Sequence, residues 1–257
     1  MNAADLWPPA PGWGDAALLA ALLLATHRNR HPRVALALPW VAFAWFGFFR
    51  GGCPCPLGTL GELPGGAVAP LAAVLLLLPL AFAQLHGRTF CGGACPVGTF
   101  QDLFGFRARR QRSHLSEKTE RRLGKLRWVA LAGTLAAPAL GAANPVCAVD
   151  PFPALYSLHF TLAASVTLLA LAAASALASR PFCRWLCPYA PLLETCAGVA
   201  PGGVTVAPGC VRCGKCDKVC PMNAIRRGVC DPGACIRCGR CATVCPKHVV
   251  RSGARRD

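Results

Sequence analysis

The chain has 257 residues, of which 54% are apolar and only 15% charged, and it carries 17 cysteines. An ordinary soluble domain has about a quarter charged residues, so this composition favours a membrane protein. The first residues lack the basic segment of a secretory signal, so metal sites explain the cysteines better than a secreted disulfide scaffold. The net charge of +16 lies mainly between apolar runs and in the tail, so we expect no nucleic-acid partner.

Long apolar runs without acidic or basic residues predict about five transmembrane helices, because a helix needs roughly 17–25 such residues to cross hydrocarbon. The first run is short and spans only if Trp13 and His27 lie at the interfaces. The expected fold is therefore a mainly α membrane protein, followed by a small α+β bacterial-type ferredoxin domain with two clusters. The five runs are Ala16–Thr26, Val34–Phe49, Ala67–Leu85, Trp128–Ala143 and Ala154–Ala178.

Alternate connecting loops are rich in Lys and Arg, which sets the expected orientation. The N-terminus and loop 50–60 are predicted outside, whereas loop 88–100 and the C-terminal module are predicted in the cytoplasm. We therefore expect a multi-pass protein of the cell inner membrane. Its expected domains are a transmembrane domain at 1–179, a cytoplasmic Cys-x3-Cys-Pro motif and linker at 180–209, and a ferredoxin-like domain at 210–257.

The C-terminal region contains the pattern Cys-x2-Cys-x2-Cys-x3-Cys-Pro twice, at 210–221 and 235–246. In bacterial ferredoxins three cysteines of such a run bind one cluster and the fourth binds the other. A zinc site would instead show separated Cys-x2-Cys pairs. Cys230 lies outside both runs and is interpreted as a small buried apolar residue. The predicted ligands of the first 4Fe-4S cluster are Cys210, Cys213, Cys216 and Cys245, and those of the second are Cys235, Cys238, Cys241 and Cys220.

Two further segments, at 88–96 and 180–188, share the pattern Arg-x-Phe-Cys-x3-Cys-Pro. Their cysteines, Cys91, Cys95, Cys183 and Cys187, fall on the same predicted membrane face. They could converge as ligands of a third iron–sulfur cluster, or each pair could be a structural thiol turn or a redox-active dithiol.

Cys53, Cys55 and Cys147 fall on the predicted outer face. We interpret them as a possible redox or metal site, with one disulfide and a leftover thiol as the alternative. His86 and His159 lie nearest the apolar runs, and each could hydrogen-bond a quinone or simply pack at an interface.

With several spans, two Cys-x3-Cys-Pro motifs and a two-cluster module, the chain resembles the membrane-bound polyferredoxins, the group of NapH, MauN and the C-terminal half of NosR. The Cys53-Pro-Cys55-Pro element is most similar to the NosR branch. The resemblance implies an electron-transfer component, quinol dehydrogenase-like rather than a stand-alone enzyme. It would link the quinone pool to nitrate or nitrous oxide respiration through a partner subunit or periplasmic reductase system.

A different class of function is also compatible with the sequence. The chain could be a redox-sensing regulatory protein, or a maturation protein that supplies electrons for assembly of a periplasmic enzyme. Substitution of the Cys53, Cys55 and Cys147 group would separate these alternatives from respiratory electron transfer.

Overall fold

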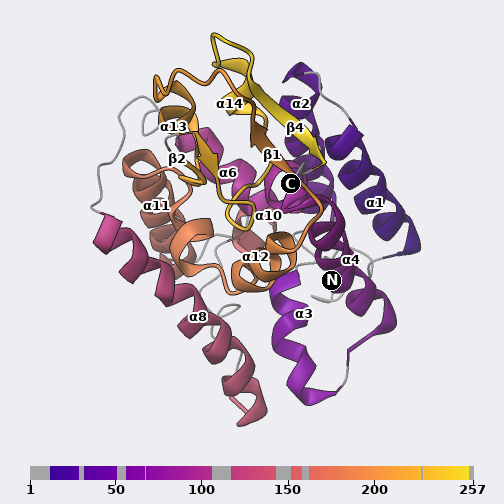
Figure 1. Cartoon of the computed structure of the whole chain (residues 1–257). Helices are drawn as coiled ribbons and strands as arrows, with labels where there is room; N and C mark the ends of the chain where they lie inside the picture. Colours follow the sequence, from indigo (N-terminus) through magenta and orange to yellow (C-terminus); the bar gives the residue numbers. More distant parts are fainter. Residues whose placement is uncertain are drawn as a thin grey trace.

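The computed structural model describes residues 12–28, 32–50, 56–66, 68–105, 117–142, 152–157, 162–226 and 228–254. Helices dominate up to residue 198, and short strands and helices follow (Figure 1). The helical elements are α1 (Trp13–Arg28), α2 (Pro32–Ala42), η2 (Phe43–Phe49), α3 (Pro56–Glu62), η3 (Leu63–Gly65), α4 (Pro70–His86), α5 (Thr89–Gly93), α6 (Pro96–Phe104), α8 (Glu117–Ala139), α10 (Phe152–Ser157), α11 (Leu162–Leu177), η4 (Phe182–Leu186) and α12 (Ala190–Gly198).

The expectation of a five-span membrane protein is wrong: no helix among the described residues is long and apolar enough to cross a membrane. The apolar runs predicted spans by their length. The helices that contain them are either too short to cross a membrane or carry charged residues along part of their length. Helices α1, α4 and α11 have 16, 17 and 16 residues. Helix α8 has 23 residues, but its first half is highly charged, from Glu117 to Arg127.

The run at 34–49 does not form one regular helix either. Helix α2 gives way at Ala42 to the π-helix η2, whose hydrogen-bonding pattern differs from that of an α-helix. The finding on helix length and polarity also overturns the predicted multi-pass location in the inner membrane, and with it the membrane sides assigned to loops 50–60 and 88–100.

A buried ion pair fixes the first helix against η2. The Asp15 carboxylate is fully buried and accepts hydrogen bonds from Trp45 Nε1 at 3.1 Å and from Arg50 Nε at 2.9 Å. Burial alone would raise the pKa of Asp15, but the Gly12 N–H, Trp45 and Arg50 together lower it. The charged form of Asp15 is therefore part of the folded structure.

The C-terminal elements are built around two antiparallel strand pairs. Strand β1 pairs with β4, from Gly202 opposite Ala254 to Val206 opposite Val250, and β2 pairs with β3. The β1–β4 pair brings together the two ends of the cysteine-rich segment. The elements are β1 (Gly202–Val206), α13 (Lys215–Val219), β2 (Ile225–Arg226), β3 (Val229–Cys230), α14 (Arg240–Thr243) and β4 (Val250–Ala254).

The two cysteine runs repeat in backbone conformation as well as in sequence. Positive φ angles recur at positions 25 residues apart: Arg212 (51°) and Arg237 (54°), and Gly214 (70°) and Gly239 (73°). The two glycines precede α13 and α14, and a left-handed conformation there costs glycine little. The segment is therefore a structural duplication.

The duplicated segment packs directly on the helical part. Met222 and Ile236 belong to the same buried cluster as Leu23, Leu75 and Leu193 of α1, α4 and α12. In Figure 1 the elements α13, α14 and β4 lie at the upper end of the molecule, away from α3. This packing places the second cysteine run against the helices that carry the Cys-x3-Cys-Pro motifs.

Candidate metal centres

The first hollow in the duplicated segment has a volume of about 440 Å³, part of it open to solvent. Its lining includes all four cysteines predicted for the first cluster: Cys210, Cys213, Cys216 and Cys245. Cys213 is exposed and the other three are partly buried. Burial tends to raise the pKa of Cys245, but backbone N–H groups, from Val249 and Lys247 among others, lower it. Such N–H donors stabilise a thiolate, which is the form that binds iron.

A second hollow, of about 360 Å³, includes in its lining the four cysteines predicted for the second cluster: Cys220, Cys235, Cys238 and Cys241. Each hollow thus contains three thiols of one run and the last thiol of the other, as the sequence pattern predicts. Thiolates are the ligands that hold 4Fe-4S clusters, so the donor set fits such a group.

Cys230 also lines the second hollow, which the sequence interpretation missed. Its side chain hydrogen-bonds that of Cys235, and this contact lowers the pKa of Cys235. Cys230 is therefore a neighbour of a predicted ligand rather than a simple apolar core residue. Its position just before the second run was the available signal.

Two buried guanidinium nitrogens that belong to side chains lining the second hollow lack a hydrogen-bond partner among the described residues: one terminal nitrogen of Arg237 and one of Arg240. Arg88 Nε, on a side chain that contacts Cys91, lacks one as well. A buried donor without a partner costs about 1–3 kcal/mol. An anionic cluster with sulfide and thiolate acceptors would relieve this cost, so these groups also fit a cluster.

The four remaining described motif cysteines come together between α5, α6 and η4. Cys91 lies in α5, Cys95 precedes α6, and Cys183 and Cys187 lie in and directly after the π-helix η4. Burial, followed by Cys183 and Cys91, raises the pKa of Cys95. Burial and then the same two thiols raise the pKa of Cys187. The structure therefore brings together four thiols that the sequence left as either one site or two separate pairs. The membrane topology used to relate them is wrong.

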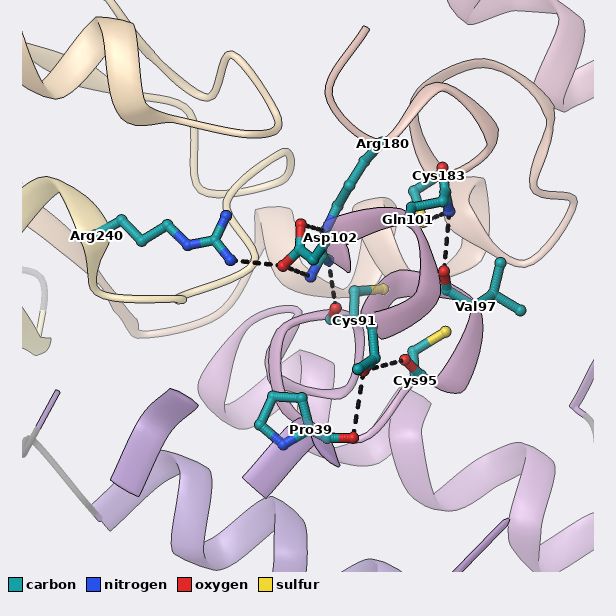
Figure 2. Close-up of polar contacts among 10 residues, drawn as sticks. Pro39, Cys91, Cys95, Val97, Gln101, Asp102, Arg180, Cys183 and Arg240 are labelled. Carbon is teal, nitrogen blue, oxygen red and sulfur yellow. Dashed lines mark hydrogen bonds and ion pairs between the residues drawn. The ribbon is translucent and has the colours of Figure 1, made fainter. Parts of the chain in front are cut away.

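Gln101, which is fully buried in α6, joins the two motifs. Its Nε2 donates to Cys183 Sγ at 3.2 Å and to the Val97 carbonyl at 3.2 Å (Figure 2). Its Oε1 accepts from the Phe182 N–H at 3.0 Å. The side chain thereby fixes η4 against α6. Sequence reasoning did not single out Gln101, because its partners in η4, Phe182 and Cys183, are 81 and 82 residues away.

Two arginines accompany these thiols, one from each motif. Arg88 and Arg180 are the first residues of the two Arg-x-Phe-Cys-x3-Cys-Pro patterns, and their exposed fractions are 1% and 2%. Arg88 approaches Cys91 Sγ at 3.9 Å, and Arg180 donates to the Cys91 carbonyl at 2.5 Å. Because both arginines occupy the first position of the repeated pattern, the sequence already indicated that they lie beside these thiols.

Among the described residues, no three Cys, His, Asp or Glu side chains are arranged to hold a single metal ion. A cubane cluster has a different requirement, because each thiolate binds its own iron and the ligands stand around a larger group. The described thiols thus fit a cluster better than a mononuclear site.

Cys53, Cys55, Cys147 and His159 lie outside the described residues, as does any site that they form. His86 stacks on His27, with ring centroids 3.8 Å apart. Burial, and then Arg237, lowers the pKa of His86.

Two family models match the chain, and each is described as a 4Fe-4S binding domain. The first matches residues 68–114 and 160–202, which include both Cys-x3-Cys-Pro motifs. The second matches residues 231–251, which include the second ferredoxin-type run. The chain therefore contains ferredoxin-type sequences in both its helical part and its C-terminal segment.

Two proteins with similar sequences were found. "Uncharacterized protein MJ0750" of Methanocaldococcus jannaschii is 27% identical over 186 residues, covering 70% of this chain and 78% of that protein. "Putative electron transport protein YccM" of Escherichia coli K12 is 26% identical over 174 residues, covering 63% of this chain and 48% of that protein. No solved structure matches the chain.

The family matches and the cysteine-lined hollows define the general class. The chain is an iron–sulfur protein with multiple 4Fe-4S clusters. The narrower relation to the membrane-bound polyferredoxins stays a prediction.

Proposed function

We propose that the chain is an electron-transfer protein with three 4Fe-4S sites. The observation that carries the proposal is the sorting of twelve motif thiols into three groups of four. The first site would use Cys210, Cys213, Cys216 and Cys245; the second Cys220, Cys235, Cys238 and Cys241; and the third Cys91, Cys95, Cys183 and Cys187. A 4Fe-4S cluster supplies reversible one-electron transfer when bound.

The residues around each site have separate tasks in this proposal. The thiolates hold the iron, and the neighbouring N–H groups and guanidinium groups offset its negative charge. The first site is the most open, because Cys213 is exposed, whereas Cys91 and Cys183 at the third site are buried. Exchange with another protein is therefore assigned to the first site, since electron transfer between proteins requires a short path to the surface.

The surface beside the first site suits an acidic redox partner. Arg212, Lys215 and Lys247 are exposed and line the first hollow, and we name them the basic rim. Charged surfaces of opposite sign steer two proteins together, and salt weakens the attraction. The proposed partner is an electron-carrier protein with an acidic face.

The resemblance to the membrane-bound polyferredoxins adds a respiratory setting to the proposal. In this setting a quinone exchanges electrons with the chain, and a reductase receives electrons from the chain. Reduction of the purified protein by a water-soluble quinol analogue tests this part separately. Absence of any cluster reduction by the quinol, in a protein that dithionite reduces fully, would remove the quinone from the proposal.

The number of clusters is tested by iron and acid-labile sulfide analysis of the anaerobically purified chain. We expect about twelve iron atoms, four for each cluster. The double variant C183A/C187A should lose about a third of both elements. The control is Cys196→Ala, which removes a half-buried thiol outside all three sites and should leave the iron content unchanged. Unchanged iron in the double variant would eliminate the third site.

The partner surface is tested by charge reversal. The double variant K215E/K247E should slow reduction by an acidic ferredoxin or flavodoxin at low salt, and high salt should abolish the difference from the wild type. Lys125→Glu, an exposed reversal on α8, serves as the control. Equal slowing by both variants would show that net charge, rather than the basic rim, governs the reaction.

A further inference from the structure

One carboxylate connects the third site with the second. Asp102, at the end of α6, accepts hydrogen bonds from Arg180 Nε at 3.1 Å and Arg180 Nη2 at 2.9 Å. The same carboxylate accepts a hydrogen bond from Arg240 Nη2 at 2.6 Å. Arg240 stands between Cys238 and Cys241, so Asp102 ties an arginine of the third site to an arginine of the second (Figure 2).

Arg180 is held there at some conformational cost. Its φ is 48°, a left-handed conformation that non-glycine residues adopt rarely. Burial alone lowers the pKa of its guanidinium, but Asp102, Cys183 and Cys238 outweigh burial and raise it. Arg180 also donates to the Cys91 carbonyl at 2.5 Å, so its guanidinium lies between the third set of thiols and the carboxylate that binds Arg240.

Arg88 makes a second connection of the same kind. Its side chain approaches Cys91 Sγ and donates to the Gly233 carbonyl at 3.4 Å, two residues before Cys235. Burial lowers the pKa of Arg88, and Cys91, Glu194, Cys183 and Cys187 raise it above its ordinary value. Its Nε has no hydrogen-bond partner among the described residues.

The backbones of the two cysteine-bearing turns, at Gly92 and Ile236, are in direct contact. A Cβ added at Gly92 would overlap the carbonyl oxygen of Ile236, and it would stand 3.3 Å from the carbonyl carbon. Gly92 follows Cys91, and Ile236 follows Cys235. The turns that carry the third and second sets of thiols thus touch without an intervening side chain.

The first site has no such arrangement among the described residues. By the 25-residue repeat, Arg240 corresponds to Lys215, and Arg237 corresponds to Arg212. Both counterparts are exposed and line the open hollow, whereas Arg240 pairs with Asp102. The repeat therefore presents its second half, and not its first, to the helical part.

From these contacts we propose that Arg88 and Arg180 are shared counter-cations of the second and third sites, and that the second site is the partner of the third. This inference rests on the three-cluster function proposed above. A 4Fe-4S cluster with four thiolates is anionic, so a cation between two of them favours the reduced state of both. The order from the surface inward is then first site, second site, third site.

The transfer that this order implies needs no bond making or breaking and no proton. Clusters held by the three sets of thiolates would supply the one-electron chemistry, and the acidic carrier would be the electron donor at the first set. The second set of thiolates would stand between the first and the third. Arg88 and Arg180 are positioning residues: they place two positive charges between the second and third sets of ligands.

The experiment is a redox titration of the full-length holoprotein, followed by EPR, with iron content measured on every sample. Arg180→Gln should lower the reduction potentials of the second and third clusters by 59 mV or more. This shift corresponds to a tenfold or larger decrease in the equilibrium constant for one-electron reduction. Asp102→Asn should raise the same two potentials, because it removes the negative charge between them. Lys215→Gln, the repeat counterpart of Arg240, is the matched control and should affect the first cluster alone.

Each outcome decides the matter. If Arg180→Gln loses iron, the opposite shift in Asp102→Asn carries the test, because that variant keeps both arginines. With three clusters present, a shift confined to the third cluster, or no shift in either variant, overturns the shared counter-cations. A wild-type protein with iron for only two clusters would instead defeat the proposed function itself, so the two failures are distinguishable.

Discussion

Replacement of Gly92 by alanine tests the contact between the two cysteine-bearing turns. The added Cβ overlaps the Ile236 carbonyl oxygen, and ordinary contact begins at 3.4 Å. The second turn would have to retreat by about 1 Å, and overpacking of this kind costs about 1–3 kcal/mol. Alanine is also the better helix former by roughly 1 kcal/mol, which stabilises α5 itself but leaves the contact broken.

A cost of about 1–3 kcal/mol corresponds to a roughly 5- to 150-fold increase in the population that has opened locally. Hydrogen exchange of the anaerobic holoprotein measures that population segment by segment. We expect faster exchange at residues 233–240, with little change in β1 and β4. Gly133→Ala in α8 is the control, because nothing lies within 4 Å of its added Cβ.

Two results would refute the reasoning on Gly92. Exchange at 233–240 that stays within about twofold of the wild type would show that the contact does not hold the second run in place. Faster exchange over the whole chain would show general destabilisation rather than release of one contact.

Three further expectations follow from single contacts. Cys230→Ala should lower the potential of the second cluster without loss of iron, because it removes a hydrogen bond to Cys235; an unchanged potential in EPR titration would contradict this. Gln101→Leu should likewise lower the potential of the third cluster, by loss of the donor to Cys183, while the other two clusters serve as internal references. Asp15→Asn should cost about 1.5–3 kcal/mol in urea unfolding at pH 7. Because the folded pKa of Asp15 is lowered, its contribution is complete above the unfolded value near 3.9 and is lost as the pH falls through the folded value; a pH-independent difference would refute the assignment.

The grouping of the cysteines was predictable because it depends on short spacings. The pattern Cys-x2-Cys-x2-Cys-x3-Cys-Pro placed Cys220 with the second run and Cys245 with the first, and the two hollows contain these thiols. The motif shared by 88–96 and 180–188 left open whether four more thiols form one site or two separate pairs, and the structure brings them together. Local patterns thus predicted which thiols would meet only for the eight of the duplicated segment.

The global fold was not predictable in the same way. Apolar run length says how many residues avoid charge, but not where a helix begins and ends. The run at 34–49 divides at Ala42, and the run at 128–143 is the continuation of a charged helix that starts at Glu117. Asp102 gave no signal because its partners, Arg180 and Arg240, are 78 and 138 residues away.

The duplicated segment has a consequence for its evolution. Its two halves share a backbone conformation, but the basic residue at one position faces solvent in the first half and a partly buried carboxylate in the second. Lysine is sufficient at position 215, because the side chain there is exposed and supplies only a positive charge at the surface. At position 240 a planar guanidinium can bind Asp102 and still direct another N–H elsewhere, which an ammonium group does less well. Related sequences should therefore exchange lysine and arginine freely at the first position and retain arginine at the second, so that the inner half of the repeat diverges more slowly than the outer half.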